Sequence, residues 1–379
     1  MKLAIIHDWL IGMRGGEKVL EALCELYPDA HIYTLFHVKG SVSKTIEDRM
    51  IKTSFVQRLP FSKRFYRYYL PLYPLAVEGF ELKDYDIVIS LSHCVAKGVI
   101  PPPNAIHIAY TFTPMRYVWD MRDSYFPESN WFSRKIVGLF SHYLRMWDVS
   151  SSARVDDFVA ISNHVAKRIE KYYRRKASVI YPPVDCSAFG ISGKTYDYYL
   201  IVSAFAPYKR IDLAIEAFNN LGLKLKIVGT GQDEKRLKRM AGKNIEFLGW
   251  QSNAALKGLY AGCKAFIFPG EEDFGIAPLE AMASGRPVIA YAKGGALETV
   301  VPLGVKERAP TGLFFVEQTP GSLAETVCYF EKKEGSFDSA SIREHALKFD
   351  KAVFKKNMAE RIREKYLALK DSEDVKEKQ

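Results

Sequence analysis

Apolar residues in the first half of the chain gather in short runs, each followed by glycine or by a helical pattern. Residues 2–8 form the first run, and the glycine-rich segment 12–17 separates it from an apolar helical pattern over residues 18–27. A strand, a glycine turn and a helix open an α/β unit. Further strand-like runs lie at residues 85–91, 106–110 and 157–161. The pattern predicts a parallel sheet wrapped by helices.

This alternation stops before Val184 and then begins again. Two successive prolines precede that residue and are incompatible with a continuing helix, and the polar stretch 187–195 is typical of a linker. Strands are then expected at residues 198–203, 224–228, 244–248, 265–268 and 287–291. We therefore predict one α/β domain over residues 1–183 and a second over residues 184–345.

The end of the chain is first amphipathic and then polar. Apolar residues recur at helical spacing between Phe349 and Tyr366, while Lys, Arg and Glu fill the other positions. Residues 370–379 are almost entirely charged or polar, which is typical of a frayed tail. Residues 346–379 are therefore predicted to form a helix, whose apolar side packs on another part of the protein, and a polar tail.

Composition narrows the classes of protein. A chain of 379 residues with 48% hydrophobic residues can bury two cores. Its apolar runs are too short for a membrane span or a signal peptide. The five cysteines are scattered and match neither a metal knuckle nor a redox pair, which favours a reducing, cytoplasmic location. The net charge of +10 favours anionic partners: nucleic acid, anionic lipid or phosphorylated small molecules.

The segment from Phe268 to Ile289 carries the strongest chemical pattern, because it combines a strand, an acidic glycine-containing loop, a helix and a second strand. Pro278 suits the first turn of a helix, and Gly285 followed by Pro287 ends it. Free backbone N–H groups at a helix N-terminus attract anions, so a diphosphate would fit there. The predicted binding residues of this segment are Phe274, Gly275, Ile276 and Ala277.

Two carboxylates accompany this anion site. Glu272 precedes the predicted helix and Glu280 lies in what we expect to be its first turn, so both should point into one cleft. Carboxylates beside a phosphate repel it unless they accept hydrogen bonds from hydroxyl groups, which sugars and riboses supply. The combination predicts a nucleotide-sugar site. The alternative is a helix whose acidic residues only complement its dipole.

The segment resembles the signature of the retaining glycosyltransferases of family 4, and the similarity extends over nearly the whole chain. It includes the segments Gly15–Glu17, Thr113–Asp120 and Pro207–Asp212. The resemblance implies an α/β protein with the GT-B fold, which has two facing Rossmann-like domains, a cleft between them, and a C-terminal helix that crosses back to the first domain.

The resemblance also implies roles for individual residues. Glu272 would contact the transferred hexose near the reacting carbon, and Glu280 would bind the ribose diol. Gly15 and Gly16 would let the first loop approach the donor diphosphate. Lys209 would pair with that diphosphate, so Glu272 and Lys209 are the predicted catalytic residues.

The acceptor side is expected at Arg116 and Asp120, in the segment that matches the family. An ion pair between these two residues at helical spacing is the alternative interpretation. Two positions depart from the family pattern: Ala204 stands where an Arg is common, and Phe112 where a His is frequent.

Other groups would compensate for these departures. Arg210 or Arg14 would supply the missing positive charge, or the helix N-terminus would carry more of the diphosphate charge. In a retaining reaction the leaving diphosphate can itself deprotonate the incoming hydroxyl, so no side-chain base is obligatory.

The predicted function is therefore retaining, metal-independent transfer of a hexose, with GDP-mannose as the preferred donor, to a glycan or lipid-linked glycan in polysaccharide biosynthesis. No cofactor is expected, because Lys209, a helix terminus and backbone amides meet the diphosphate charge. The alternatives are a catalytically impaired nucleotide- or glycan-binding subunit, a GT-B nucleotide-sugar epimerase, and a phosphorylase.

Two further features have open interpretations. Basic and aromatic residues alternate over residues 58–70. One interpretation is a segment that binds an anionic membrane surface, at the inner face of the cell membrane. The other is a solvated helix whose aromatic side chains pack in the core. Nucleic acid is not expected, since no reader motif is present. His93 and His164 lie in loop-like positions after predicted strands and remain unassigned.

Overall fold

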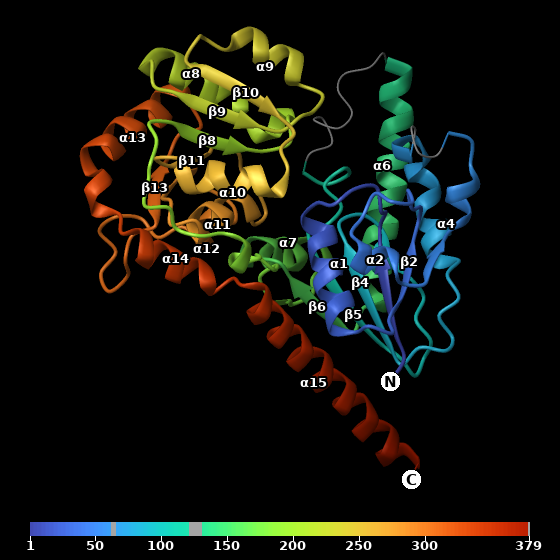
Figure 1. Ribbon diagram of the computed structural model, residues 1–379. Helices are drawn as coiled ribbons and strands as arrows, with labels where there is room; N and C mark the ends of the chain where they lie inside the picture. Colours follow the sequence, from blue (N-terminus) through green and yellow to red (C-terminus); the bar gives the residue numbers. More distant parts are fainter. Residues whose placement is uncertain (62–65, 121–130, 378–379) are drawn as a thin grey trace. The chain divides into compact units, whose positions relative to one another are not determined.

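The computed structural model describes residues 1–61, 66–120 and 131–377 (Figure 1). The chain divides into two compact units. Unit 1 comprises Met1–Pro183 and Ala352–Gln379, and unit 2 comprises Val184–Lys351. Each unit contains a sheet of parallel strands with helices packed on it, which confirms the predicted two-domain α/β fold.

The sheet of unit 1 has seven parallel strands in the order β3-β2-β1-β4-β5-β6-β7. The strands are β1 (Leu3–His7), β2 (His31–Thr34), β3 (Ile51–Thr53), β4 (Ile87–Ser92), β5 (Ile106–Thr111), β6 (Asp157–Ala160) and β7 (Ser178–Val179). All residues of β1, β4 and β5 are buried, as expected for central strands of a parallel sheet that is covered on both faces. The carboxyl ends of these strands therefore form one edge.

Helices of unit 1 connect these strands. They are α1 (Gly15–Leu26), α2 (Lys44–Glu47), α4 (Tyr73–Glu78), α6 (Trp131–Ser151), α7 (Asn163–Tyr173) and α15 (Lys351–Glu377). α7 begins where the Ser162 hydroxyl accepts the Val165 N–H at 3.1 Å. α15 packs on unit 1 beyond Ala352, where Met358 and Ile362 are buried.

Residues 66–70 of the basic and aromatic stretch lie in a short helical segment. Tyr66–Leu72 form a 3₁₀ turn and α4 follows it. Within the stretch Leu70 is buried, whereas Tyr68 is 80% exposed. Part of this stretch, residues 62–65, lies outside the described residues. Its aromatic side chains therefore do not all join the core.

The sheet of unit 2 has six parallel strands in the order β10-β9-β8-β11-β12-β13. They are β8 (Tyr199–Val202), β9 (Leu225–Val228), β10 (Ile245–Gly249), β11 (Phe266–Phe268), β12 (Val288–Tyr291) and β13 (Gly312–Phe315). The helices are α8 (Ile211–Leu221), α9 (Glu234–Met240), α10 (Asn253–Gly262), α11 (Ile276–Ala283), α12 (Ala296–Thr299), α13 (Pro320–Lys333) and α14 (Ser339–Leu347). β8 and β11 are neighbours, so the loops after them lie at the same edge.

Candidate functional site

The predicted loop and helix after β11 are present. Gly275 precedes α11 with φ of 90°, and a Cβ there would lie 2.8 Å from the Phe268 ring, so glycine is required on both counts. α11 ends at Ala283, and Gly285 follows with φ of 73°. One detail of the prediction was wrong: Glu280 is the fifth residue of α11 and lies in its second turn. The loop before α11 holds the acidic residues near the helix N-terminus.

Lys209 and Glu272 form an ion pair in unit 2. Lys209 ends the 3₁₀ turn Pro207–Lys209 after β8, and Glu272 lies in the loop after β11. The Lys209 Nζ is 2.6 Å from the Glu272 Oε2, and the side chains are 15% and 21% exposed. The two predicted catalytic residues are therefore together, and part of each side chain is exposed.

Glu280 has a different partner. The Tyr260 hydroxyl, on α10, donates to the Glu280 Oε2 at 2.9 Å. Burial raises the pKa of Tyr260, so its hydroxyl stays protonated and can act as a donor. Glu280 is 8% exposed, which leaves little of it available at the surface. Tyr260 thus orients the carboxylate that the resemblance assigns to the ribose.

Two glycines that the sequence interpretation missed pack on the Glu272 loop. Gly294 has φ of 67°, and a Cβ there would lie 2.3 Å from the Glu272 carbonyl oxygen. The Gly295 N–H donates to that oxygen at 2.8 Å, and a Cβ at Gly295 would lie 2.3 Å from the Phe274 Cα. The Gly-Gly pair shortly after a predicted strand was the available signal. These contacts fix the backbone beside the acidic loop.

Ala204 stands where the family commonly has Arg, and Arg210 was predicted to supply the missing positive charge. Ala204 is exposed. Arg210 has φ of 52°, and its guanidinium contacts Asp212 at 3.4 Å and Gln318 at 3.2 Å. Gly231 lets the turn after β9 approach the Phe205 backbone, since a Cβ there would lie 2.4 Å from the Phe205 oxygen. Arg210 is therefore anchored to its own neighbours.

In unit 1 the first glycine loop lies at the carboxyl edge of the sheet. Gly15 and Gly16 begin α1, and the Arg14 N–H donates to the Glu17 carboxylate at 3.0 Å. A Cβ at Gly16 would lie 3.3 Å from the His7 Nε2. Glycine thus keeps the first turn of α1 close to the end of β1. Arg14 is exposed.

The segment of residues 113–120, which was predicted to lie on the acceptor side, is held by α7. Arg168 donates to the Thr113 hydroxyl at 2.7 Å and forms an ion pair with Asp120, to which the Tyr172 hydroxyl also donates. Asp120 thus has Arg168 as a partner, 48 residues further along the chain, whereas the alternative interpretation paired it with Arg116, which is half-buried. Asp120 therefore helps to hold this segment on α7.

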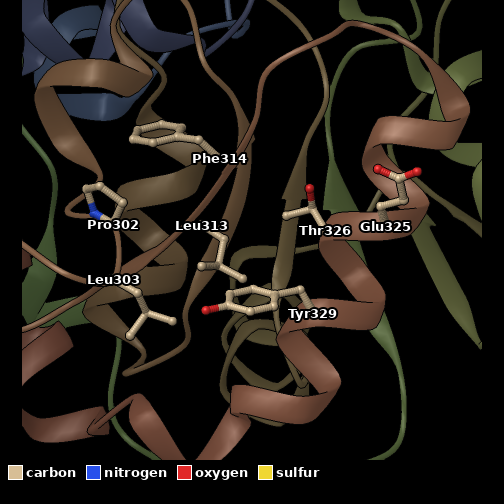
Figure 2. A pocket seen from close by; sticks show the side chains of 7 residues that line it. All are labelled: Pro302, Leu303, Leu313, Phe314, Glu325, Thr326 and Tyr329. Carbon is tan, nitrogen blue, oxygen red and sulfur yellow. The ribbon is translucent and has the colours of Figure 1, made fainter.

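Other features do not add to the candidate site. A surface pocket of about 400 Å³ lies in unit 2 between β13, α13 and residues 302–303 (Figure 2), and none of the predicted site residues lines it. Among the described residues no group of three His, Cys, Asp or Glu side chains could hold a metal ion. In the same part of the chain, no helix combines the length and the hydropathy that crossing a bilayer requires.

Two family models match the chain. The model described as Glycosyltransferase Family 4 matches residues 13–188, and the model described as Glycosyl transferases group 1 matches residues 187–355. Together they span both units except for the two ends of the chain.

Two curated relatives with similar sequences are named as mannosyltransferases. The O-antigen chain mannosyltransferase RfbU of Salmonella typhimurium is 32% identical over 184 residues, which is 45% of this chain and 50% of that protein. The chain thus spans about half the length of this relative. The alpha-1,3/1,6-mannosyltransferase ALG2 of Saccharomyces cerevisiae is 26% identical, with 82% of this chain and 73% of that protein covered.

Among solved structures, HepE of Anabaena in complex with UDP superposes with a TM-score of 0.71 at 16% identity, covering 96% of this chain and 100% of that one. At this identity the likeness concerns the fold alone. The family matches and the fold agree with each other over both units. The chain belongs to the glycosyltransferases of family 4 and has their GT-B fold.

Proposed function

We propose that the protein transfers a hexose, with retention of the anomeric configuration, from a nucleotide-sugar to a glycan or lipid-linked glycan. The observation that carries the proposal is the accessible ion pair between Lys209 and Glu272, at adjacent strand ends beside the N-terminus of α11. An ammonium group and a helix N-terminus attract a diphosphate, whereas a carboxylate accepts hydrogen bonds from hydroxyl groups. A ligand with both chemical groups, a sugar diphosphate, would engage both partners of the pair.

The reaction would need no metal ion. Lys209 and the backbone N–H groups at α11 would carry the negative charge that develops on the leaving diphosphate. Glu272 would lie near the reacting carbon and stabilise the positive charge that forms there. Activity that persists in EDTA would support this part of the proposal, and activity that requires an added divalent ion would contradict it.

Mannose is the proposed sugar and GDP-mannose the proposed donor. The support is that RfbU and ALG2 are both named as mannosyltransferases. A thermal-shift screen with GDP, UDP, ADP and dTDP sugars tests the donor, because a ligand that binds the native state raises the apparent melting temperature. The largest shift is expected with GDP-mannose.

The catalytic role of Glu272 is tested by replacing it with Gln. The adjacent Glu271 is also half-buried and provides a matched control. We expect Glu272→Gln to lower turnover at least about 100-fold, while Glu271→Gln stays near wild type. Binding of the nucleotide should persist in both variants, because Lys209 is retained. Equal turnover in the two variants would remove Glu272 from the mechanism.

A catalytically impaired binding subunit is the second candidate. It is favoured by the exposed Ala204 where the family commonly has Arg, and by the contacts of Arg210 with Asp212 and Gln318. Such a subunit would bind the nucleotide-sugar but would not transfer the hexose to any acceptor in a lipid-linked pool. The Glu272→Gln comparison is then uninformative, and the wild-type turnover itself decides between the two functions.

We also propose that the protein works in the cytoplasm, at the inner face of the cell membrane. α6 exposes Leu139 (69%), Tyr143 (41%) and Met146 (55%) on one side, with Lys135 exposed on the same helix. α4 lies beside α6 (Figure 1) and contributes Leu75. The Trp147 indole of α6 donates to Glu78 of α4 at 2.8 Å. Nearly all of the net charge of +10 lies in unit 1. Apolar side chains beside an excess of cations favour an anionic lipid surface.

Vesicle flotation tests this membrane contact. The protein should float with vesicles that contain phosphatidylglycerol and should dissociate at high salt. Leu139→Ser with Met146→Ser should abolish flotation. The control Val316→Ser, which changes a 74% exposed apolar residue of unit 2, should have no effect. Equal flotation of all variants would contradict a lipid-binding role of α6.

A further inference from the structure

The loop after β11 holds Glu272 against the turn that carries Lys209. A Cβ at Gly270, in this loop, would lie 3.0 Å from the Lys209 carbonyl oxygen and 3.1 Å from the Lys209 Cα, so glycine allows the two backbones to approach closely. On the other side of the loop, the Gly295 N–H donates to the Glu272 carbonyl oxygen at 2.8 Å. The backbones of both partners are therefore fixed, and the ion pair opens by rotation of its side chains.

The charges around this ion pair are unbalanced. Glu271, Glu272 and Asp273 follow one another in the loop, and the Lys209 ammonium lies 2.6 Å from the Glu272 carboxylate. A diphosphate that binds Lys209 brings further negative charge beside this carboxylate. Two anions that share one ammonium group repel each other unless one of them accepts hydrogen bonds from other donors. A diphosphate and the Glu272 carboxylate therefore compete for Lys209.

The ligands present before and after hexose transfer differ in what they offer to Glu272. A nucleotide-sugar carries hexose hydroxyl groups, which donate to a carboxylate and replace the contact that the ammonium gives up. A nucleoside diphosphate has no hexose. Its binding to Lys209 leaves the Glu272 carboxylate, whose side chain is only 21% exposed, beside an anion and without that replacement. The repulsion therefore weakens the binding of the bare nucleotide more than that of the nucleotide-sugar.

We propose that Glu272 makes the site selective for the sugar-bearing nucleotide over the bare nucleoside diphosphate, because its carboxylate competes for Lys209 whenever no hexose hydroxyl occupies it. This inference rests on the proposed transfer function and gives Glu272 a second role there. Specificity of this kind comes from a charge that the disfavoured ligand leaves unpaired. After transfer, the carboxylate returns to the ammonium, and the nucleoside diphosphate loses a partner. The ion pair thereby promotes release of the product.

Calorimetry with GDP and GDP-mannose, without an acceptor, tests this selectivity; if the donor screen identifies another base or sugar, the corresponding two ligands are used. We expect Glu272→Gln to bind GDP at least about fivefold more tightly than the wild type, because an uncharged amide competes poorly for Lys209. The affinity for GDP-mannose should rise less or fall, because an amide accepts hydroxyl donors less strongly than a carboxylate. The control Glu271→Gln removes the same charge one residue away and should keep the wild-type ratio of the two affinities.

A double-mutant cycle separates competition for the ammonium from simple repulsion. Lys209→Met removes the shared group and keeps a long side chain. In this background Glu272 still repels a diphosphate but has no ion pair to lose. The gain in GDP affinity from Glu272→Gln should therefore be at least about twofold smaller in Lys209→Met than in the protein that retains Lys209. Both side chains are partly exposed, so melting temperatures near that of the wild type are expected for all variants.

The outcomes separate this inference from the function on which it rests. An unchanged affinity of Glu272→Gln for GDP, an equal gain for GDP-mannose, or an equal gain with and without Lys209 would overturn the selectivity, while hexose transfer by the wild type would still support the proposed function. If the expected gain is found but the wild type transfers no hexose to any acceptor, the selectivity stands and the proposed transfer is wrong. A wild type that binds neither GDP nor any nucleotide-sugar would overturn both.

Discussion

The buried ion pair between Lys97 and Asp148 offers a sharp test of what stabilises unit 1. The Lys97 Nζ lies 2.9 Å from the Asp148 Oδ1, and the side chains are 2% and 0% exposed. Nζ also donates to the Ser151 hydroxyl at 2.7 Å. The Asp148 Oδ2 accepts the Trp119 indole N–H at 2.8 Å and the Tyr173 hydroxyl at 2.9 Å. The pair therefore joins α6, α7 and the acceptor-side segment.

Lys97→Met removes the ammonium group but keeps most of the side-chain volume, so the cavity cost is small. It leaves the carboxylate of Asp148 buried with only neutral donors. Removal of one partner of a buried pair costs about 3 to 5 kcal/mol. In a domain of this size, each kcal/mol of lost unfolding free energy lowers the melting temperature by about 2 to 4 °C. The melting temperature of unit 1 should therefore fall by roughly 10 °C.

Urea unfolding followed by tryptophan fluorescence measures this loss in the right unit. Four of the five tryptophans belong to unit 1, and the fifth, Trp250, is 77% exposed. The fluorescence change therefore reports mainly on unit 1. Lys83→Met, at an exposed position, is the control. If both variants unfold at the same urea concentration, the pair does not stabilise the fold and the reasoning fails.

Three further predictions concern pH, packing and hydrogen bonding. Burial lowers the pKa of His107 to about 4, so the unfolded chain binds a proton between about pH 6.5 and 4 that the folded protein does not. Unfolding free energy should thus fall by up to about 3 kcal/mol on acidification through this window, and less in His107→Gln, as urea titrations at each pH would measure. Gly295→Ala should weaken nucleotide-sugar binding about tenfold in calorimetry, since its Cβ would meet the Phe274 backbone. Gly258→Ala, with no atom within 4 Å, should not. Tyr260→Phe removes a hydrogen bond to Glu280 and should cost about 1 kcal/mol in thermal unfolding.

Specific outcomes would contradict these expectations. An equal pH dependence in the wild type and His107→Gln would assign the acid sensitivity to other groups. Undiminished binding by Gly295→Ala would show that the loop around Glu272 can shift without affecting the donor. A Tyr260→Phe variant more stable than the wild type would indicate that the hydroxyl is poorly accommodated beside Glu280.

The apolar pattern predicted the central strands well because these strands are buried on both faces. β1, β4 and β5 are mainly apolar, and they were recognised from the sequence. β2, β3, β7 and β13 were missed; β3 and β7 are short and half-buried or exposed, so neither has an apolar run. Edge strands receive their conformation from a neighbour, and a pattern within one segment contains little of that information.

The candidate site was predicted only in part, because its decisive contacts join distant positions. The resemblance named Lys209 and Glu272, but their ion pair depends on the adjacency of β8 and β11. The alternative interpretation paired Asp120 with Arg116 at helical spacing, yet Arg168 of α7 binds Asp120. Local spacing predicts a contact only when the segment is a helix, and residues 116–120 form a turn.

The return of the chain to unit 1 imposes an order on biosynthesis. Phe354 packs edge to face on Tyr110 at 5.7 Å, and Arg361 pairs with Asp157 at 2.6 Å. These contacts need residues that the ribosome adds only after the whole of unit 2. Unit 2 is continuous and can complete its core while it is being synthesised, whereas unit 1 must wait, with the apolar surface for Phe354, Met358 and Ile362 uncovered. Unit 1 is synthesised first, but its core is complete only after translation has passed residue 351.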